Sequence, residues 1–149
     1  METNKSYRGF KDLKVYPVKF FLTLKEIFYK RILFHGVNQL AYQLALEIFE
    51  LTKSFPKEKR YSLVDQIRRS SKSICTNIAE AWYKRRYPKS FVNKLIDFAG
   101  ESGETEVWID FSFDFNYMNL EQKTRFLEKY SQVGKMLNSM INQPEKFCH

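Results

Sequence analysis

The sequence predicts an all-α protein, an antiparallel up-down four-helix bundle with an additional N-terminal amphipathic helix. Apolar residues recur at spacings of three and four along five segments of helical length, which is typical of helices that bury one face. Proline, glycine, serine and asparagine stand at the ends of these segments, where helices start and stop. No alternation of apolar and polar residues bounded by turn signals competes with this pattern, and short connections favour antiparallel neighbours.

Three parts of the chain are expected to differ in structure. Residues 1–16 are predicted to be an irregular N-terminal arm, residues 17–38 an inserted amphipathic helix, and residues 39–149 the four-helix bundle domain. Pro17 is tolerated near a helix start, and Gly36 is placed to end the inserted helix. The apolar face of this helix consists of Phe20, Phe21, Leu24, Ile27, Phe28, Ile32 and Phe34. Three uses of it stay open: packing on its own bundle, covering a subunit interface, or lying on an anionic membrane surface.

Each of the four bundle helices has an expected start and an apolar stripe. The expected starts are, in chain order, Asn38, Ser62 with Asp65 as a capping-box-like pair, Pro88, and Asn119. The stripes consist of Leu40, Leu44, Ile48, Leu51, then Leu63, Ile67, Ile74, Ile78, then Phe91, Leu95, Phe98, Ile109, then Phe126, Leu127, Tyr130, Val133, Leu137 and Ile141. Ser70 and Ser71 lie in the second stripe, where small residues would let a neighbouring helix approach closely.

A chain of 149 residues is long enough to bury a hydrophobic core without disulfides or a metal ion. Cys75 and Cys148 make no disulfide framework, and no cysteine or histidine spacing indicates a zinc site. The polar N-terminus lacks the apolar region of a signal peptide, and no apolar run approaches the length of a membrane span. We therefore expect a cytoplasmic protein.

The net charge of +8 is unevenly distributed along the chain. Residues 60–94 carry nine Lys and Arg against two Asp and Glu, a net charge of +7. Residues 95–149 carry five against nine, a net charge of −4. A basic middle followed by an acidic end suits a polyanionic partner, and it equally suits basic and acidic faces that meet between subunits.

One stretch of the chain resembles a known family. Residues 55–82 read FPKEKRYSLVDQIRRSSKSICTNIAEAW, in which FPKE, QIRR, SI and NIAE are in register with the hallmark of the bacterial four helix bundle proteins, also called 23S rRNA intervening-sequence proteins. The segments LKVY (13–16) and QLAYQLALEIFELTK (39–53) resemble the two parts of the family's first helix. Those two parts are contiguous in the family, whereas here the 22 residues of 17–38 separate them.

The resemblance implies a four-helix up-down bundle that assembles into a ring, typically a pentamer, and a link to structured RNA. One relative is the accessory variability determinant of diversity-generating retroelements, a basic pentameric barrel that binds a reverse transcriptase and nucleic acid. The implied partners are therefore other copies of the chain, RNA or DNA, and a reverse transcriptase or other protein. For most members no biochemical role is established.

The candidate nucleic-acid-binding residues are cations on the predicted outer face of the basic helix, in the turn that follows, and one to two turns into the next helix. They are Arg68, Arg69, Lys72, Lys84, Arg85, Arg86, Lys89 and Lys94. Cations of this kind contact phosphates without reading the base sequence. The interleaved aromatic residues Trp82, Tyr83 and Tyr87 are candidates for stacking on unpaired bases.

The alternative is that these cations pair with acidic residues. Asp97, Glu101 and Glu104 are spaced to form one acidic face on the next helix, or on a neighbouring subunit. For Arg68 and Arg69 the sequence favours this structural role. For the cluster 84–86 it favours binding, because only Glu80 is an acidic neighbour in sequence.

Nothing in the sequence indicates an enzyme, a metal site or a cofactor. A di-metal bundle requires Glu-x-x-His pairs, and neither His35 nor His149 follows a glutamate by three residues. No histidine is placed to activate Cys75, which we expect to be a small buried residue. The aromatic run 108–115 is expected to be core or subunit interface. The leading hypothesis is a non-enzymatic oligomeric scaffold that binds nucleic acid; the rivals are a protein–protein adaptor and a membrane-surface module.

Overall fold

Four α-helices make up most of residues 36–148, the part of the chain that the computed structural model describes, apart from the side chains of residues 59–61. They are α2 (Gly36–Leu51), α3 (Asp65–Lys84), α4 (Pro88–Asp114) and α5 (Leu120–Asn142). Short helical turns, Thr52–Ser54, Lys57–Lys59 and Arg60–Val64, connect α2 to α3, and a last turn, Pro144–Lys146, follows α5. No strand occurs among these residues, so the predicted all-helical class is confirmed for them.

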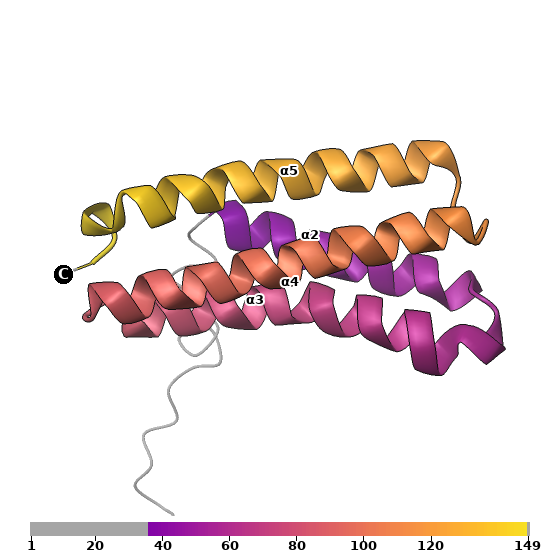
Figure 1. The fold of residues 1–149 in the computed structure, drawn as a ribbon, viewed down its shortest axis with the longest axis horizontal. Coiled ribbons are helices and arrows are strands. Elements are labelled where there is room, and N and C mark those ends of the chain that lie inside the picture. Colours follow the sequence, from indigo (N-terminus) through magenta and orange to yellow (C-terminus); the bar gives the residue numbers. More distant parts are fainter. Residues whose placement is uncertain (1–35, 149) are drawn as a thin grey trace, which may run out of the picture. The chain divides into compact units, whose positions relative to one another are not determined.

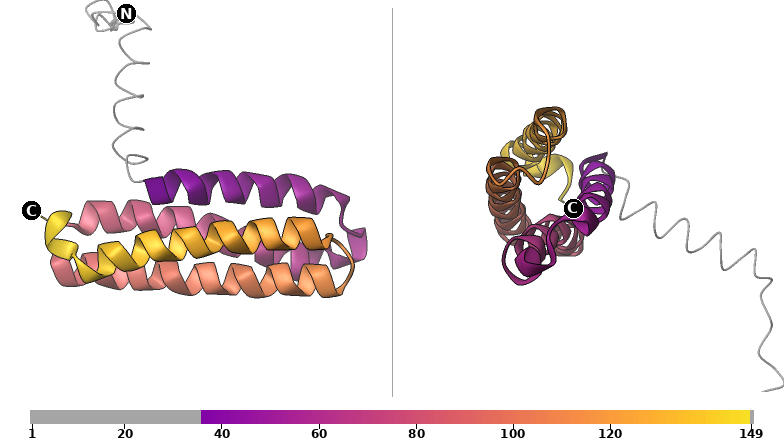
Figure 2. Two further views of the ribbon diagram at one scale, coloured as in Figure 1. Left: turned by 90° about the horizontal axis from the view of Figure 1, so that it is seen from above. Right: turned by 90° about the vertical axis from the view of Figure 1, so that its right-hand side faces the viewer.

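The four helices lie side by side along one long axis, and successive ribbons follow opposite directions (Figure 1). α3 packs against both α2 and α4, α4 packs against α5, and α5 packs against α2. The end-on view in Figure 2 shows the helices arranged around a common centre. The helical bundle is thus closed by contacts on all four sides.

The core of the bundle is built from the predicted stripes. The fully buried members include Leu44 and Ile48 of α2, Ile67 and Ile74 of α3, Phe91, Leu95, Phe98 and Ile109 of α4, and Phe126, Tyr130, Val133 and Leu137 of α5. Ser70 and Ser71 are buried as well, and the Ser70 hydroxyl accepts a hydrogen bond from the Thr105 hydroxyl at 2.9 Å. The small α3 residues therefore lie directly against α4.

Two predicted helix starts are confirmed. Pro88 is the first residue of α4, where its missing N–H costs no helical hydrogen bond. Asn119 caps α5: its side-chain oxygen accepts from the Gln122 backbone N–H at 2.8 Å, and the Gln122 side chain accepts from the Asn119 backbone N–H at 2.9 Å. This reciprocal pair satisfies two donors that the helix itself leaves without partners.

The other two predicted starts are wrong. Gly36, the residue expected to end the preceding helix, already belongs to α2, so Asn38 lies inside the helix and is buried instead of forming the cap. Val37, the residue before Asn38, is buried in the core. Ser62 falls within the π-helical turn that precedes α3, and this turn buries Leu63 on the bundle. In both places a residue expected to cap a helix lies inside a helical segment instead.

The predicted inserted helix, residues 17–38, lies outside the described residues except for its last three, which belong to α2. The predicted arm, residues 1–16, lies outside them entirely.

We expect Asn119→Ala to lower the free energy of unfolding by about 1 kcal/mol, because the N-cap acceptor for the Gln122 N–H is lost. Urea unfolding followed by circular dichroism measures this change. Ser131→Ala, at an exposed position within the same helix, is the matched control and should be within about 0.5 kcal/mol of the parent. Equal effects of the two substitutions would contradict a capping role.

Candidate nucleic-acid interface

α3 carries a cationic face because it buries the opposite one. Ile67, Ile74 and Ile78 fix the inner side of the helix, so Arg69 and Lys72 are exposed on the outside. The helix ends in a tight turn, in which the Tyr87 N–H donates to the Lys84 carbonyl at 2.9 Å. We call the eight predicted cations from Arg68 to Lys94 the cationic edge.

Arg68 is bound by neutral oxygen atoms. Its Nε donates to the Thr52 hydroxyl at 2.7 Å, and its Nη2 donates to the Phe49 carbonyl at 3.3 Å. The guanidinium also lies 4.5 Å from the centre of the Phe49 ring. Arg68 therefore binds a carbonyl at the C-terminal end of α2, where helix carbonyls lack partners. The expected pairing of Arg68 with a carboxylate is not found among the described residues.

Arg69 contacts an acidic residue of the next helix. Its Nη2 lies 2.7 Å from Glu104 Oε1, which also accepts from the Trp108 indole N–H at 3.1 Å. The Arg69 side chain remains more than half exposed, so the pair contributes at most about 1 kcal/mol. Arg69 is thus used in linking α3 to α4.

Lys94 is held by two carboxylates. Its ammonium lies 3.0 Å from Glu80 and 3.1 Å from Asp97. Hydrogen bonds to Glu80 and then to Asp97 raise the pKa of Lys94. Glu80 also lies 3.9 Å from Lys84. Lys94 is therefore a poorer candidate for a phosphate contact than its sequence position suggests.

The remaining cations keep their charge unbalanced. Lys72, Arg86 and Lys89 are exposed and make no ion pair or hydrogen bond with any residue of 36–148. The Arg85 guanidinium donates to the Trp82 carbonyl at 2.8 Å and has no carboxylate partner within the same range. Three carboxylates contact the eight cations of the edge, which leaves a surplus of five positive charges.

The aromatic candidates differ in accessibility. Tyr83 and Tyr87 are 60% and 69% exposed beside the turn, so their rings are open to a ligand. The Trp82 ring is less open, because the Arg85 guanidinium lies 4.4 Å from its centre. Only two of the three predicted stacking residues thus present a free ring.

The predicted acidic face divides among different partners. Glu104 binds Arg69 and Asp97 binds Lys94, whereas Glu101 forms no ion pair among the described residues. Its Oε2 is buried without a hydrogen-bond partner there. Glu101 therefore forms no salt pair within the described part of one copy, and its pairing with a neighbouring subunit stays a prediction.

Sequence reasoning missed two lysines at the opposite end of α3. Lys53 and Lys57 line a hollow together with Arg68, although they precede it by 15 and 11 residues. The sequence feature that could have indicated Lys57 is the FPKE stretch, in which this lysine follows a proline at a turn. Their proximity to Arg68 depends on how α2 turns into α3, which no local pattern specifies.

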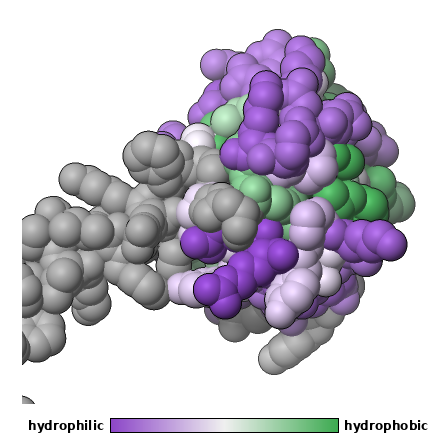
Figure 3. Space-filling model, turned by 90° about the vertical axis from the view of Figure 1, so that its left-hand side faces the viewer, coloured by the Kyte–Doolittle hydropathy of each residue, from purple (hydrophilic) through white to green (hydrophobic). Residues whose placement is uncertain are grey.

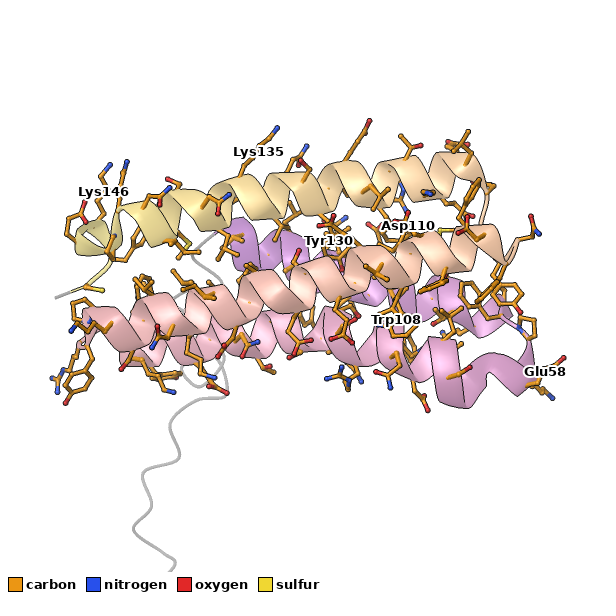
Figure 4. All side chains as sticks on the ribbon, viewed as in Figure 1. Glu58, Trp108, Asp110, Tyr130, Lys135 and Lys146 are labelled. Atoms are coloured by element: carbon orange, nitrogen blue, oxygen red, sulfur yellow. The ribbon has the colours of Figure 1, made fainter. Side chains whose placement is uncertain are left out.

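Two groups in the interior have altered acidity. Burial raises the pKa of the Tyr130 phenol, which lies between the helices in Figure 4. Burial also raises the pKa of Cys75 from 9.0 to about 11. Cys75 is only half-buried, less than the sequence suggested. No group of three or more His, Cys, Asp and Glu side chains among residues 36–148 is arranged to hold a metal ion.

We expect Cys75 to react with iodoacetamide at pH 8 about 100-fold more slowly in the folded protein than in urea. The reason is that raising the pKa of the thiol from 9.0 to about 11 lowers the fraction of reactive thiolate about 100-fold. The same shift predicts a pH dependence. Between pH 9 and about 11 the Cys75 thiol keeps its proton in the folded state but has lost it in the unfolded state. The free energy of unfolding is therefore highest below pH 9 with respect to this group, and it falls as the pH rises from 9 to about 11. Mass spectrometry of the labelled peptide measures the rate. Equal rates in both states would contradict the shift.

The structure defines a class: a small helical-bundle protein with an electropositive edge along α3, the turn that follows it and the first turns of α4. Among the described helices none has the length and apolar composition needed to cross a bilayer.

The chain belongs to the 23S rRNA-intervening sequence protein family, whose sequence model matches residues 35–139. It is also similar to the crystal structure of a protein of unknown function from the S23 ribosomal protein family of Bacteroides thetaiotaomicron VPI-5482. The two are 30% identical with a TM-score of 0.65, and the match covers 72% of this chain and 96% of that one. No curated protein matches the chain. The resemblance seen in residues 55–82 is thereby confirmed.

Proposed function

We propose that the chain is a non-enzymatic, homo-oligomeric scaffold that binds structured RNA or another nucleic acid through the cationic edge. The observation that carries this proposal is the surplus of five positive charges, with Lys72, Arg86 and Lys89 exposed and unpaired within residues 36–148. The family's description, which refers to 23S rRNA, makes RNA the first polyanion to test.

The edge has two parts that suit such a ligand. Unpaired cations on α3 and in the turn after it contact backbone phosphates and release the counterions bound there. Tyr83 and Tyr87 stand beside these cations with open rings, a combination that suits unpaired bases in a loop. Recognition of this kind is weak for one copy and independent of base sequence.

Self-association supplies the missing affinity in this proposal. An antiparallel up-down bundle of this family is proposed to form a ring, with a pentamer as the expected size, so that several weak edges act together. Large apolar residues left exposed on α4 and at its C-cap, namely Ile96, Val107, Phe111 and Phe115, support an interface with other copies. Figure 3 shows hydrophobic surface between hydrophilic surfaces at one end of the bundle. A reverse transcriptase or other protein is a further proposed partner.

A second candidate function is a protein–protein adaptor. The ion pairs of Arg69 and Lys94 favour it, because they show that part of the edge is neutralised inside one copy. An apolar groove between α2 and α3, with walls that include Tyr42, Leu46 and Phe49, would serve such an adaptor.

A salt titration distinguishes the two functions. Fluorescence anisotropy with a hairpin RNA should give a dissociation constant that increases steeply between about 50 and 200 mM salt, as expected for several phosphate contacts. Light scattering on the same samples gives the solution mass. No binding at about 50 mM salt would contradict the RNA scaffold and favour the adaptor, and a monomeric mass would contradict the oligomeric part.

A further inference from the structure

A cationic hollow lies at the end of the bundle where α2 turns into α3. We call it the corner pocket; it has a volume of about 220 Å³. Its lining consists of Phe49, Thr52, Lys53, Phe55, Pro56, Lys57, Val64 and Arg68. Figure 4 labels Glu58, the neighbour of Lys57, at this end of the molecule. The cationic turn 85–87 is at the opposite end of α3, about 26 Å away at 1.5 Å per residue.

The pocket contains an arginine that is already oriented. Hydrogen bonds to the Thr52 hydroxyl and the Phe49 carbonyl, together with the Phe49 ring, hold the Arg68 guanidinium in place. These partners are all uncharged, so Arg68 keeps its full positive charge. They engage Nε and Nη2, which leaves Nη1 without a hydrogen bond to the described residues. A fixed guanidinium with free donors loses little entropy when it binds an anion.

The charges around Arg68 add to this preference. Lys57 forms no ion pair or hydrogen bond with any residue of 36–148. Lys53 lies 2.7 Å from Glu50, an exposed residue that is not part of the lining. No carboxylate lines the pocket, and Phe49 and Phe55 supply apolar walls. Attraction between charges is stronger beside such walls than in open water.

We propose that the corner pocket binds a phosphate group, with the Arg68 guanidinium and the Lys57 ammonium as its main donors and Lys53 at the rim. Arginine and lysine are the side chains that bind phosphate oxygens most strongly, through charge-assisted hydrogen bonds. The phosphate has two possible sources, a nucleic-acid backbone or a free phosphate. In the first case this inference deepens the proposed function, because one RNA would contact both ends of α3. In the second case it is independent of that function.

The first test uses inorganic phosphate and needs no RNA. In a chloride buffer of low ionic strength, NMR titration of the full chain should shift the Arg68 Nε–H and the backbone amides of residues 53–55 and 57 in a saturable way. Lys57→Met should weaken this binding about tenfold, which corresponds to one charge-assisted hydrogen bond. The fold should persist, because Lys57 is exposed and has no described partner. Lys135→Met, at an exposed position on α5, is the matched control.

The second test distinguishes the sources. A short single-stranded RNA is titrated in the same way, followed by competition with inorganic phosphate. Pocket resonances that shift with RNA and return on adding phosphate assign the site to nucleic acid; resonances that respond only to inorganic phosphate assign it to a free phosphate. The proposal is overturned if inorganic phosphate causes no saturable shift, or if Lys57→Met and Lys135→Met weaken binding equally. RNA binding at the cationic edge is measured separately, by shifts of residues 85–89.

Discussion

Replacing Arg86 and Lys89 by alanine is expected to weaken RNA binding about 30-fold. Both side chains are exposed and make no ion pair within residues 36–148, so both are available to phosphates. At about 1 kcal/mol for each charged contact, two contacts give about 2 kcal/mol, or roughly 30-fold. The slope of log affinity against log salt concentration should also become shallower by about 1.5. Anisotropy titrations at several salt concentrations measure both quantities.

The matched control for this variant removes two lysines elsewhere. Lys135 on α5 and Lys146 after it are exposed in Figure 4 and make no ion pair with the described residues. The Lys135→Ala and Lys146→Ala double variant has the same net charge as the test variant. If both variants lose the same affinity, net charge alone explains the binding and the cationic edge is not the interface. If neither loses affinity, the proposed function is wrong.

Phe98→Ala is expected to lower the free energy of unfolding by about 3–5 kcal/mol, a large part of the stability of a domain of this size. Phe98 is fully buried in the middle of α4, so the substitution removes a complete ring and leaves a cavity in the core. Urea unfolding followed by circular dichroism gives the change directly.

Ile96→Ala is the comparison for Phe98→Ala. Ile96 is two residues away on the same helix and is 53% exposed. If no other copy covers it, Ile96→Ala should change the free energy of unfolding by less than about 1 kcal/mol. A small change that is independent of protein concentration supports an exposed Ile96. A large change that depends on protein concentration shows instead that another copy covers it, which supports the proposed oligomer. A Phe98→Ala change no greater than that of Ile96→Ala would contradict the core described for α4.

The helices themselves could be predicted well from the sequence because burial repeats with the helical period. Ile67, Ile74 and Ile78 are buried in the core as their spacing predicts. Asn119 caps α5 because the backbone N–H that its side chain binds, that of Gln122, is close to it in the sequence. The start of α3 could not be predicted, because the π-helical turn that precedes it buries Leu63 against distant parts of the chain.

The candidate site, like the helix starts, could be predicted from the sequence only in part. Helical phase placed the cations on the outer side of α3, but it does not determine their partners. Glu80 reaches Lys94 on another helix, and Arg68 reaches the end of α2; both contacts depend on how three helices pack. The corner pocket was not predictable, because it joins Lys57 to Arg68 across a turn.

Two adjacent arginines on α3 serve different neighbours. Arg68 is tied to the last turn of α2 and Arg69 to the middle of α4, since consecutive residues on a helix diverge by about 100°. Two consecutive side chains of α3 therefore contact α2 and α4. Any partner that draws the Arg68 side chain toward itself would loosen the α2 attachment and leave the α4 attachment intact. The consecutive arginines of the QIRR sequence thus make separate polar contacts with the two helices that pack against α3.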